Sequence, residues 1–344
     1  MMQPLAVHHA TRRGFLASAI STSLGAAGTA RAVTSPPPAD KALIAITLDL
    51  EMSRHYPTWD QTHWDYEKGN LDAATKSYAL EAARRVKGHG GVIHFFAVGQ
   101  TMEQEDVGWL REIVAQRHPV GNHTYDHVNV KATRAEDIQF RFRRAPWLIE
   151  GKTPAEVIAG NIRLAESALK HRVGIPPAGF RTPGGFADGL ADRPDLQAML
   201  LKMGYSWVSS KYPAHPIGAA GQPPDRTVMA GIVAAQAQAQ PFIYPSGLVE
   251  VPMSPISDVT AFRSGRWPLE AFLDAVRSGV SWAIEQRAVF CLLSHPSCLV
   301  VTDPAFRAIE MICELVRKAG DRAAIADLDT VARRAIKKSL SSSR

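Results

Sequence analysis

The fold is decided by LIAITLD (residues 43–49), LDAATKSYALEAARRVKG (71–88) and VIHFFAV (92–98). The first and third stretches are apolar runs of strand length. The middle stretch repeats its apolar residues at helical spacing and ends on glycine, which commonly follows the last turn of a helix. A strand, a helix and a second strand in this order form the repeating unit of a parallel α/β sheet.

The same alternation continues along the chain. We expect further helices over 107–117, 155–171 and 195–204, and further strands over 119–122, 178–181, 205–210, 247–253 and 289–294. About seven strands separated by helices predict an irregular (β/α) barrel rather than an open doubly wound sheet. No GxGxxG motif follows the first strand and the chain has no P-loop, so we expect no nucleotide cofactor.

The N-terminus resembles a twin-arginine export signal. Arg12-Arg13 precedes a weakly apolar stretch, and Ala30 and Ala32 place small residues where a signal peptidase cleaves. We expect a signal peptide over 1–32, a Pro-rich linker over 33–41 and one domain over 42–335, with export to the periplasm or beyond. The alternative is a disordered basic tail. The apolar run is too short and polar to span a membrane, so no integral membrane segment is expected after cleavage.

Length and composition fit one large globular domain. The chain has 344 residues, of which 46% are hydrophobic, and its three cysteines are too few for a disulfide framework. Its formal charge of +6 falls to +3 on cleavage, because three arginines and no acids are removed. With RFRR (141–144) as a solvated face, we expect no nucleic-acid partner. The interval 211–246 is too long for an ordinary connection and could be a lid, a groove wall or a mobile insertion.

Polar residues follow several predicted strands. Asp49 and Glu51 are two apart at the end of the first strand, so they point the same way on an extended chain. His123 and His127 in GNHTYDH (121–127) are four apart, which is one helical turn, so their rings could lie on one side. Histidine pairs with a carboxylate commonly bind zinc and similar metals.

Three more strands end on, or contain, residues of functional type. Arg181 lies in FRTPGGF (180–186), His295 directly follows VFCLLS (289–294), and Trp207 lies in YSWVSS (205–210). Taken singly, each has an ordinary explanation as a loop cation, a capping residue or a core aromatic residue. Because reactive residues gather at the carboxyl ends of parallel strands, we expect the group as a whole to form a site.

This order of motifs resembles the polysaccharide deacetylase family, also known as the NodB-homology domain or carbohydrate esterase family four. The resemblance spans roughly residues 42–330. It includes an acid pair after the first strand, His-Ser/Thr-x-x-His, Arg-x-Pro with a following glycine, a groove tryptophan, and a leucine-rich strand that runs into a histidine. The matching segments are TLDLE (47–51), HTYDH (123–127), RTPGG (181–185), Trp207 and LLSHP (292–296).

Two positions depart from the family pattern. The commonest first motif has two adjacent aspartates, whereas here Leu50 separates Asp49 from Glu51. The fourth motif usually brings an aspartate near its tryptophan, and SWVSS (206–210) has none. Asp258 in VPMSPISD (251–258) is a substitute candidate for the group that tunes His295.

The resemblance implies a role for each motif. Glu51, His123 and His127 would hold one divalent metal ion, zinc before cobalt, manganese or nickel. Asp49 would act as the general base, with Arg181 paired to it, and His295 would protonate the leaving amine.

The substrate-binding residues expected with these motifs are Trp207, Tyr125, Pro183, Trp59 and Trp64. The last two lie in SRHYPTWDQTHWDY (53–66), whose aromatic rings suit stacking against sugars. An aromatic loop of purely structural role explains this segment equally well.

Three functions are compatible with this sequence. The leading prediction is a metal-dependent hydrolase that removes N-acetyl groups from an extracytoplasmic glycan, such as chitooligosaccharide, peptidoglycan or an exopolysaccharide, and releases acetate. The alternative is a hydrolase of small cyclic amides or imides on the same fold. A non-catalytic carbohydrate-binding domain comes third, because candidates for the base, the acid and both histidine ligands are all present.

Overall fold

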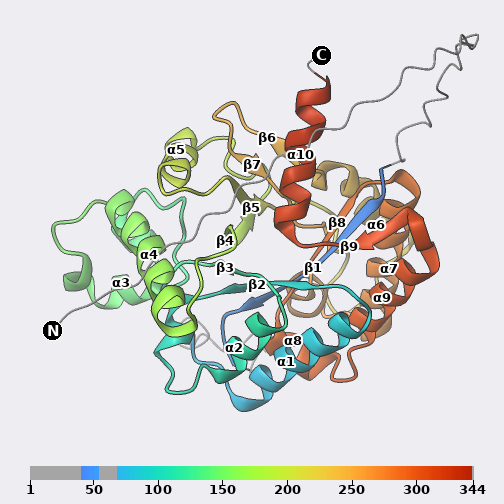
Figure 1. Cartoon of the computed structure of the whole chain (residues 1–344), viewed down its shortest axis with the longest axis horizontal. Coiled ribbons are helices and arrows are strands. Elements are labelled where there is room, and N and C mark those ends of the chain that lie inside the picture. The colour runs from blue at the N-terminus through green and yellow to red at the C-terminus, as the bar shows by residue number, and fades with distance from the viewer. Residues whose placement is uncertain (1–39, 54–67, 343–344) are drawn as a thin grey trace, which may run out of the picture. The chain divides into compact units, whose positions relative to one another are not determined.

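The computed structural model describes residues 40–53 and 68–342. The predicted signal peptide, most of the predicted linker and the aromatic segment 54–67, with Trp59 and Trp64, lie outside the described residues. The first strand, β1 (Ala42–Leu50), lies inside the sheet next to the last strand of its order, and all nine of its residues are buried. This burial is typical of a parallel strand covered on both faces. Parallel partners flank it on both sides, β2 (Ile93–Ala97) and β8 (Val289–Ser294) (Figure 1).

The sheet curls into an irregular barrel. Its strand order is β6-β7-β5-β4-β3-β2-β1-β8, and β9 pairs with the start of β1. The remaining strands are β3 (Val120–Asn122), β4 (Phe180–Phe186), β5 (Trp207–Lys211), β6 (Phe242–Ile243), β7 (Val249–Glu250) and β9 (Ala323–Ile325). A bridge between Ser257 and Leu293 joins the segment after β7 to β8.

The predicted barrel is therefore confirmed. The described residues contain eight parallel strands and one antiparallel strand, β6, where about seven strands were expected.

Helices cover the outside of this barrel (Figure 1). Their bounds are α1 (Ala73–Gly88), α2 (Gly108–Ala115), α3 (Phe140–Arg144), α4 (Pro154–Ala168), α5 (Pro194–Lys202), α6 (Arg226–Ala235), α7 (Leu269–Gln286), α8 (Pro296–Thr302), α9 (Arg307–Ala319) and α10 (Leu328–Ser342). Among residues 40–53 and 68–342, no helix is long and apolar enough to cross a bilayer.

Alternation along β1 separates two environments. Ile46 and Leu48 pack in the cluster that includes buried residues of α1 and α7, whereas Ala45 packs in a second cluster inside the barrel. Because side chains of a strand alternate between its two faces, Thr47 and Asp49 continue the inward column that begins with apolar residues. The interior of the barrel therefore becomes polar toward the carboxyl end of β1.

The long interval 211–246 is a packed part of the fold. It contains α6, whose Val228 and Ile232 belong to the main core, and β6. Just after α6, the buried Gln236 donates through Nε2 to Ser254 Oγ at 3.1 Å and to the carbonyl of Val289 at 3.2 Å. These contacts fix α6 to the strands beside it, which accounts for the length of the connection.

We expect Gly179→Ala to destabilise the protein more than Gly204→Ala does. Both glycines have positive φ, and a Cβ at Gly179 would lie 2.0 Å from the ring of Trp207, whereas one at Gly204 would meet nothing within 4 Å. Left-handed backbone costs an alanine about 1–2 kcal/mol at either site, and overpacking adds about 1–3 kcal/mol at Gly179 alone. Urea denaturation measures both; equal losses of unfolding free energy would contradict the expectation.

Candidate active site

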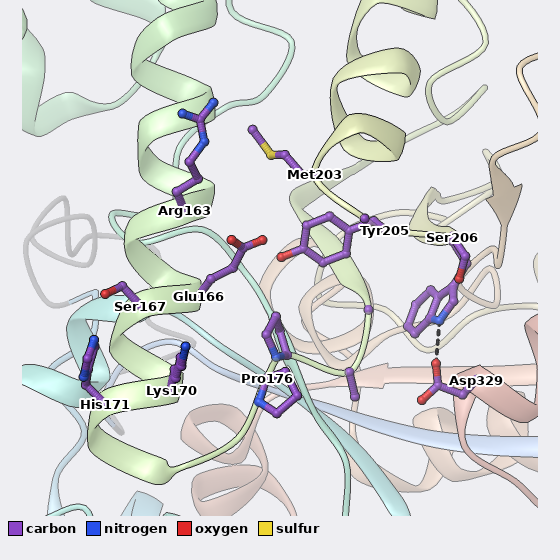
Figure 2. Close-up of a pocket in the computed structure, with 15 residues that line it drawn as sticks. Arg163, Glu166, Ser167, Lys170, His171, Pro176, Met203, Tyr205, Ser206 and Asp329 are labelled. Atoms are coloured by element: carbon purple, nitrogen blue, oxygen red, sulfur yellow. Dashed lines mark hydrogen bonds between the residues drawn. The ribbon is translucent and has the colours of Figure 1, made fainter.

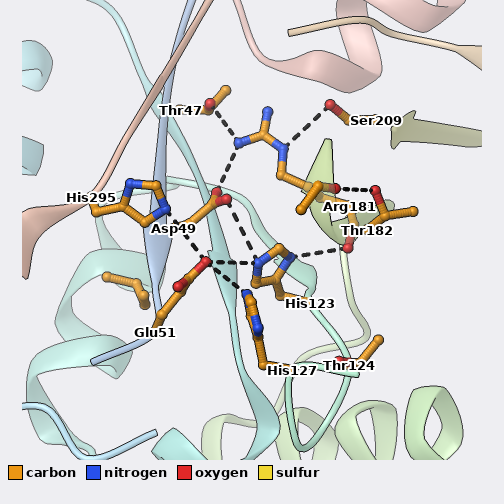
Figure 3. A network of polar contacts seen from close by, with 12 residues as sticks. Thr47, Asp49, Glu51, His123, Thr124, His127, Arg181, Thr182, Ser209 and His295 are labelled. Carbon is orange, nitrogen blue, oxygen red and sulfur yellow. Dashed lines mark hydrogen bonds and ion pairs between the residues drawn. The ribbon is translucent and has the colours of Figure 1, made fainter. Parts of the chain in front are cut away.

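The acid pair stands at the carboxyl end of β1. Asp49 and Glu51 are only 3% and 7% exposed, and both side chains turn to the inner side of the barrel, as their spacing of two predicted (Figure 3). Two buried carboxylates so close together need compensating cations or hydrogen-bond donors. The residues around them supply both.

The histidine pair comes from a tight turn after β3. The sequence suggested one helical turn, and this is wrong, because Thr124 and His127 adopt left-handed backbone with φ of 59° and 57°. Asn161 on α4 holds the turn, since its Oδ1 accepts from the backbone N–H groups of Tyr125 and Asp126 at 2.8 Å each. The Nε2 atoms of His123 and His127 thereby reach 3.1 Å from Glu51 Oε1.

Glu51, His123 and His127 fit a divalent metal ion. Their ligand atoms lie within 4.8 Å of one another. His123 Nδ1 lies 3.0 Å from the carbonyl oxygen of Arg181, and because a carbonyl can only accept, Nδ1 carries the proton and Nε2 presents its lone pair. Burial lowers the pKa of His127 to about 4, so this histidine is neutral at pH 7. Two imidazole nitrogens and one carboxylate oxygen match the ligand set of a catalytic zinc site with positions left open.

Lys68 completes the surroundings of Glu51, and no motif in the sequence indicated it. Its side chain is buried and pairs with Glu51 Oε2, while Oε1 faces the histidines. Burial alone would raise the pKa of Glu51, but the charges of Lys68 and His295 hold it well below its usual range. The backbone N–H of Gly69 donates to the carbonyl of Glu51 at 2.5 Å, and this contact brings Lys68 to the site.

Arg181 lies fully buried inside the barrel and orients Asp49. Its Nη1 donates to Asp49 Oδ1 and to Thr47 Oγ1, both at 2.8 Å, and its Nε donates to Ser209 at 3.3 Å (Figure 3). The guanidinium also stacks 4.3 Å from the centre of the Phe96 ring. The expected pairing of Arg181 with Asp49 is therefore present in the structure.

His295 approaches Glu51 from the other side of β1. Its Nε2 lies 3.4 Å from Glu51 Oε1, and Asp258 accepts from its Nδ1 at 2.9 Å and from its backbone N–H at 2.6 Å. Burial would lower the pKa of His295, but Asp258 and Glu51 raise it well above its usual value. Asp258, the substitute candidate from the sequence, is thus the group that holds the imidazolium in place.

The predicted substrate-binding residues separate in the structure. Pro183 lines a cavity of about 330 Å³ together with His127. Tyr125 lines a different cavity and donates its hydroxyl hydrogen to Glu103. Trp207 was expected in the groove, and this is wrong: it is 2% exposed and its Nε1 donates to Asp329 Oδ1 at 2.7 Å. The reason is that β5 begins at Trp207, which puts the indole at the amino end of the barrel.

A larger cavity lies at this amino end and is distinct from the site. It has a volume of about 740 Å³ and lies between α4 and the segments that lead into β4 and β5 (Figure 2). Arg163 and Glu166 border it from α4, and Asp329 borders it from α10. None of the predicted catalytic or metal-binding residues lines it. The predicted catalytic residues therefore lie at the opposite end of the barrel, at the carboxyl ends of the strands.

Comparison with protein families gives a match over the middle of the chain. Residues 70–204 match the family model described as polysaccharide deacetylase. Over these 135 of its 344 residues, the chain is similar to the polysaccharide deacetylase family. The matched region includes His123, His127 and Arg181, and the acid pair and His295 lie on either side of it. This match supports the predicted class of enzyme, a hydrolase that acts on carbon–nitrogen bonds other than peptide bonds.

Solved structures are similar over most of the chain. A Mycobacterium smegmatis protein assigned to the polysaccharide deacetylases is 17% identical, with a TM-score of 0.59 over 89% of this chain and 94% of that chain. A Pseudomonas aeruginosa PAO1 protein with the same assignment is 15% identical, with a TM-score of 0.56 over 87% and 94%.

The fold also resembles Puue allantoinase, at 12% identity and a TM-score of 0.52 over 87% of this chain and 93% of that one. At these identities the likeness shows the fold. No curated protein sequence matches this chain.

We expect His123→Ala to weaken zinc binding by more than about 100-fold, because it removes one of the three converging ligands. His171→Ala changes an exposed histidine outside the site and serves as the matched control. Isothermal titration calorimetry of the purified variants with zinc measures both affinities. Equal affinity in His123→Ala and the parent protein would refute the ligand assignment.

Proposed function

We propose that this protein is an exported, metal-dependent N-deacetylase that releases acetate from an N-acetylated glycan. The observation that carries the proposal is the convergence of His123, His127 and His295 on one oxygen of Glu51, with Asp49 held alongside by Arg181. Such a set supplies metal ligands, a general base and a general acid within one buried site.

Glu51, His123 and His127 would hold the metal ion, zinc or one of cobalt, manganese and nickel. When bound, the ion would lower the pKa of a water molecule and polarise the carbonyl of the acetamide. Asp49 is placed to take the proton of that water, since its Oδ2 lies 3.7 Å from His123 Nε2 and its Oδ1 is fixed by Arg181. The charged guanidinium orients the carboxylate without competing for the proton.

His295 would then donate a proton to the nitrogen of the leaving amine. An amine leaves poorly without that proton, and a charged histidine can provide it. The site meets both needs, because Asp258 favours the protonated ring and anchors it through Nδ1, which leaves Nε2 directed toward Glu51. The base and the acid come from neighbouring strand ends on β1 and β8, so the reacting amide would bind between them.

Export and domain limits complete the proposal. The twin-arginine pattern at Arg12-Arg13 supports delivery to the periplasm or beyond, where N-acetylated polymers occur. Cleavage after Ala32 would leave a linker to residue 41 and the catalytic domain over 42–335. Pro183 would contact the substrate, since it shares a cavity with His127.

A second candidate is a hydrolase of small cyclic amides or imides. Two observations favour it: Leu50 separates the acid pair, and Asp49, Glu51 and His295 are each no more than 7% exposed, which suits a small substrate. The same residues would act on either bond, so the distinction lies in the substrate alone.

The deciding experiment measures acetate release by the zinc-loaded protein on a panel of N-acetylated oligosaccharides. Asp49→Asn is the blank: we expect it to keep zinc and to lose about 10²- to 10⁴-fold in rate, the usual contribution of a general base. Near-full activity of Asp49→Asn would exclude this residue as the base. Turnover of cyclic amides in place of any glycan would establish the second candidate.

We also expect Asp258→Asn to lower kcat by about 10- to 100-fold while zinc affinity stays unchanged, because an amide no longer favours the charged form of His295. Asp225→Asn is the control, since Asp225 is an exposed helix N-cap where asparagine serves equally well. Steady-state kinetics and zinc titration compare the two variants. A parent-like kcat in Asp258→Asn would argue against His295 as the acid.

A further inference from the structure

The segment 129–153, between the histidine turn and α4, forms a wall fixed to the barrel. It contains α3 and the short helix η4 (Pro146–Ile149). Ile138, Phe142 and Ile149 are buried in the same core cluster as residues of α4 and β5. Three such anchors in a short stretch hold the backbone in place, because each would lose its apolar contacts if the segment moved away.

Trp147 points outward from this wall. It is 68% exposed, more than any other large apolar side chain in the part of the chain that the structure describes. Its neighbour Pro146 restricts the backbone at the start of η4, and Ile149 on the same turn is buried. A tryptophan carries one of the largest apolar surfaces of any side chain, and here the fold presents it to the solvent on a fixed backbone.

Two neighbouring cavities lie between the histidine turn and Trp147. The cavity of about 330 Å³ that His127 and Pro183 line is also lined by Glu136 and Arg143. A second cavity, of about 590 Å³, is lined by Glu136, Arg143 and Trp147. The two cavities therefore adjoin at Glu136 and Arg143. A chain molecule with its reacting group beside His127 could run past these two charged residues to the indole.

The rim of the second cavity is polar. Glu136, Arg143, Glu150 and Lys152 surround the single exposed aromatic ring. A flat apolar face with hydrogen-bond donors and acceptors around it suits a sugar, whose C–H faces pack on aromatic rings and whose hydroxyl groups bond to charged side chains. The neighbouring cavities and the polar rim both favour a glycan over a protein partner.

We propose that Trp147 is the stacking platform of a distal sugar subsite, so that the substrate is an oligomer or polymer that extends from His127 past Arg143. This inference rests on the proposed glycan deacetylase function and specifies its substrate by length. The sugar at Trp147 is remote from the scissile amide, so its binding affects long substrates and not the chemistry itself.

The test compares kcat/KM for a hexamer and a dimer of β-linked N-acetylglucosamine. In Trp147→Ala we expect the hexamer-to-dimer ratio to fall by about three- to tenfold, the worth of one stacked aromatic contact. Trp147→Phe should restore most of the ratio, because it keeps an aromatic face. Leu340→Ala removes another exposed apolar side chain, on α10 and 66% exposed, and should leave the ratio unchanged.

A binding experiment tests this inference separately from the proposed function. Calorimetry of the hexamer and the dimer with Asp49→Asn, with and without Trp147→Ala, reports on the subsite even where no acetate is released. If hexamer affinity depends on Trp147 but the parent protein releases no acetate, the subsite is sustained and the deacetylase function is rejected. Equal ratios in Trp147→Ala and the parent, no hexamer binding, or a dimeric protein that Trp147→Ala converts to monomer with the ratio unchanged would each overturn the subsite.

Discussion

The buried guanidinium of Arg181 is the constraint on which the site depends. A fully buried cation is tolerated only where an opposite charge and hydrogen-bond acceptors meet it. Here Thr47 and Asp49 on β1 and Ser209 on β5 meet it, and the ring of Phe96 packs against it. One side chain thus ties β1, β4 and β5 together. The position of Asp49, the proposed general base, is consequently set by the packing of the barrel and not by a surface loop.

The interior of the barrel is apolar at the amino ends of the strands and polar at their carboxyl ends, and this difference determines where the site lies. At the amino end, α10 packs with the apolar residues of β1, and Trp207 bonds to Asp329. Toward the carboxyl end, the inward column of β1 passes to Thr47 and then Asp49. Apolar side chains fill the amino end of the barrel, and the charged side chains converge at its carboxyl end. The loops there can then differ without disturbing the core.

Much of this was predictable because strand ends carry local signals. The apolar run at 289–294 matches β8, and the acids and histidines after β1 and β3 were expected to meet and do. What failed depends on tertiary contacts. The histidine turn is left-handed because Asn161 holds it, and Trp207 starts β5 where the sequence could not fix the strand boundary. Lys68 reaches Glu51 through a backbone contact of Gly69, which no residue pattern reports.

The bond that orients His123 has a wider meaning for variation in this protein. Its acceptor is the main-chain carbonyl at position 181, so every residue type there offers the same oxygen. Replacing the Arg181 side chain would change the surroundings of Asp49, whereas the carbonyl that orients the ring of His123 would remain. The two functions of the position therefore belong to different atoms, one to the side chain and one to the main chain. The orientation of the His123 ring depends on the backbone path of β4, and a comparison of side chains in sequences would not detect this dependence.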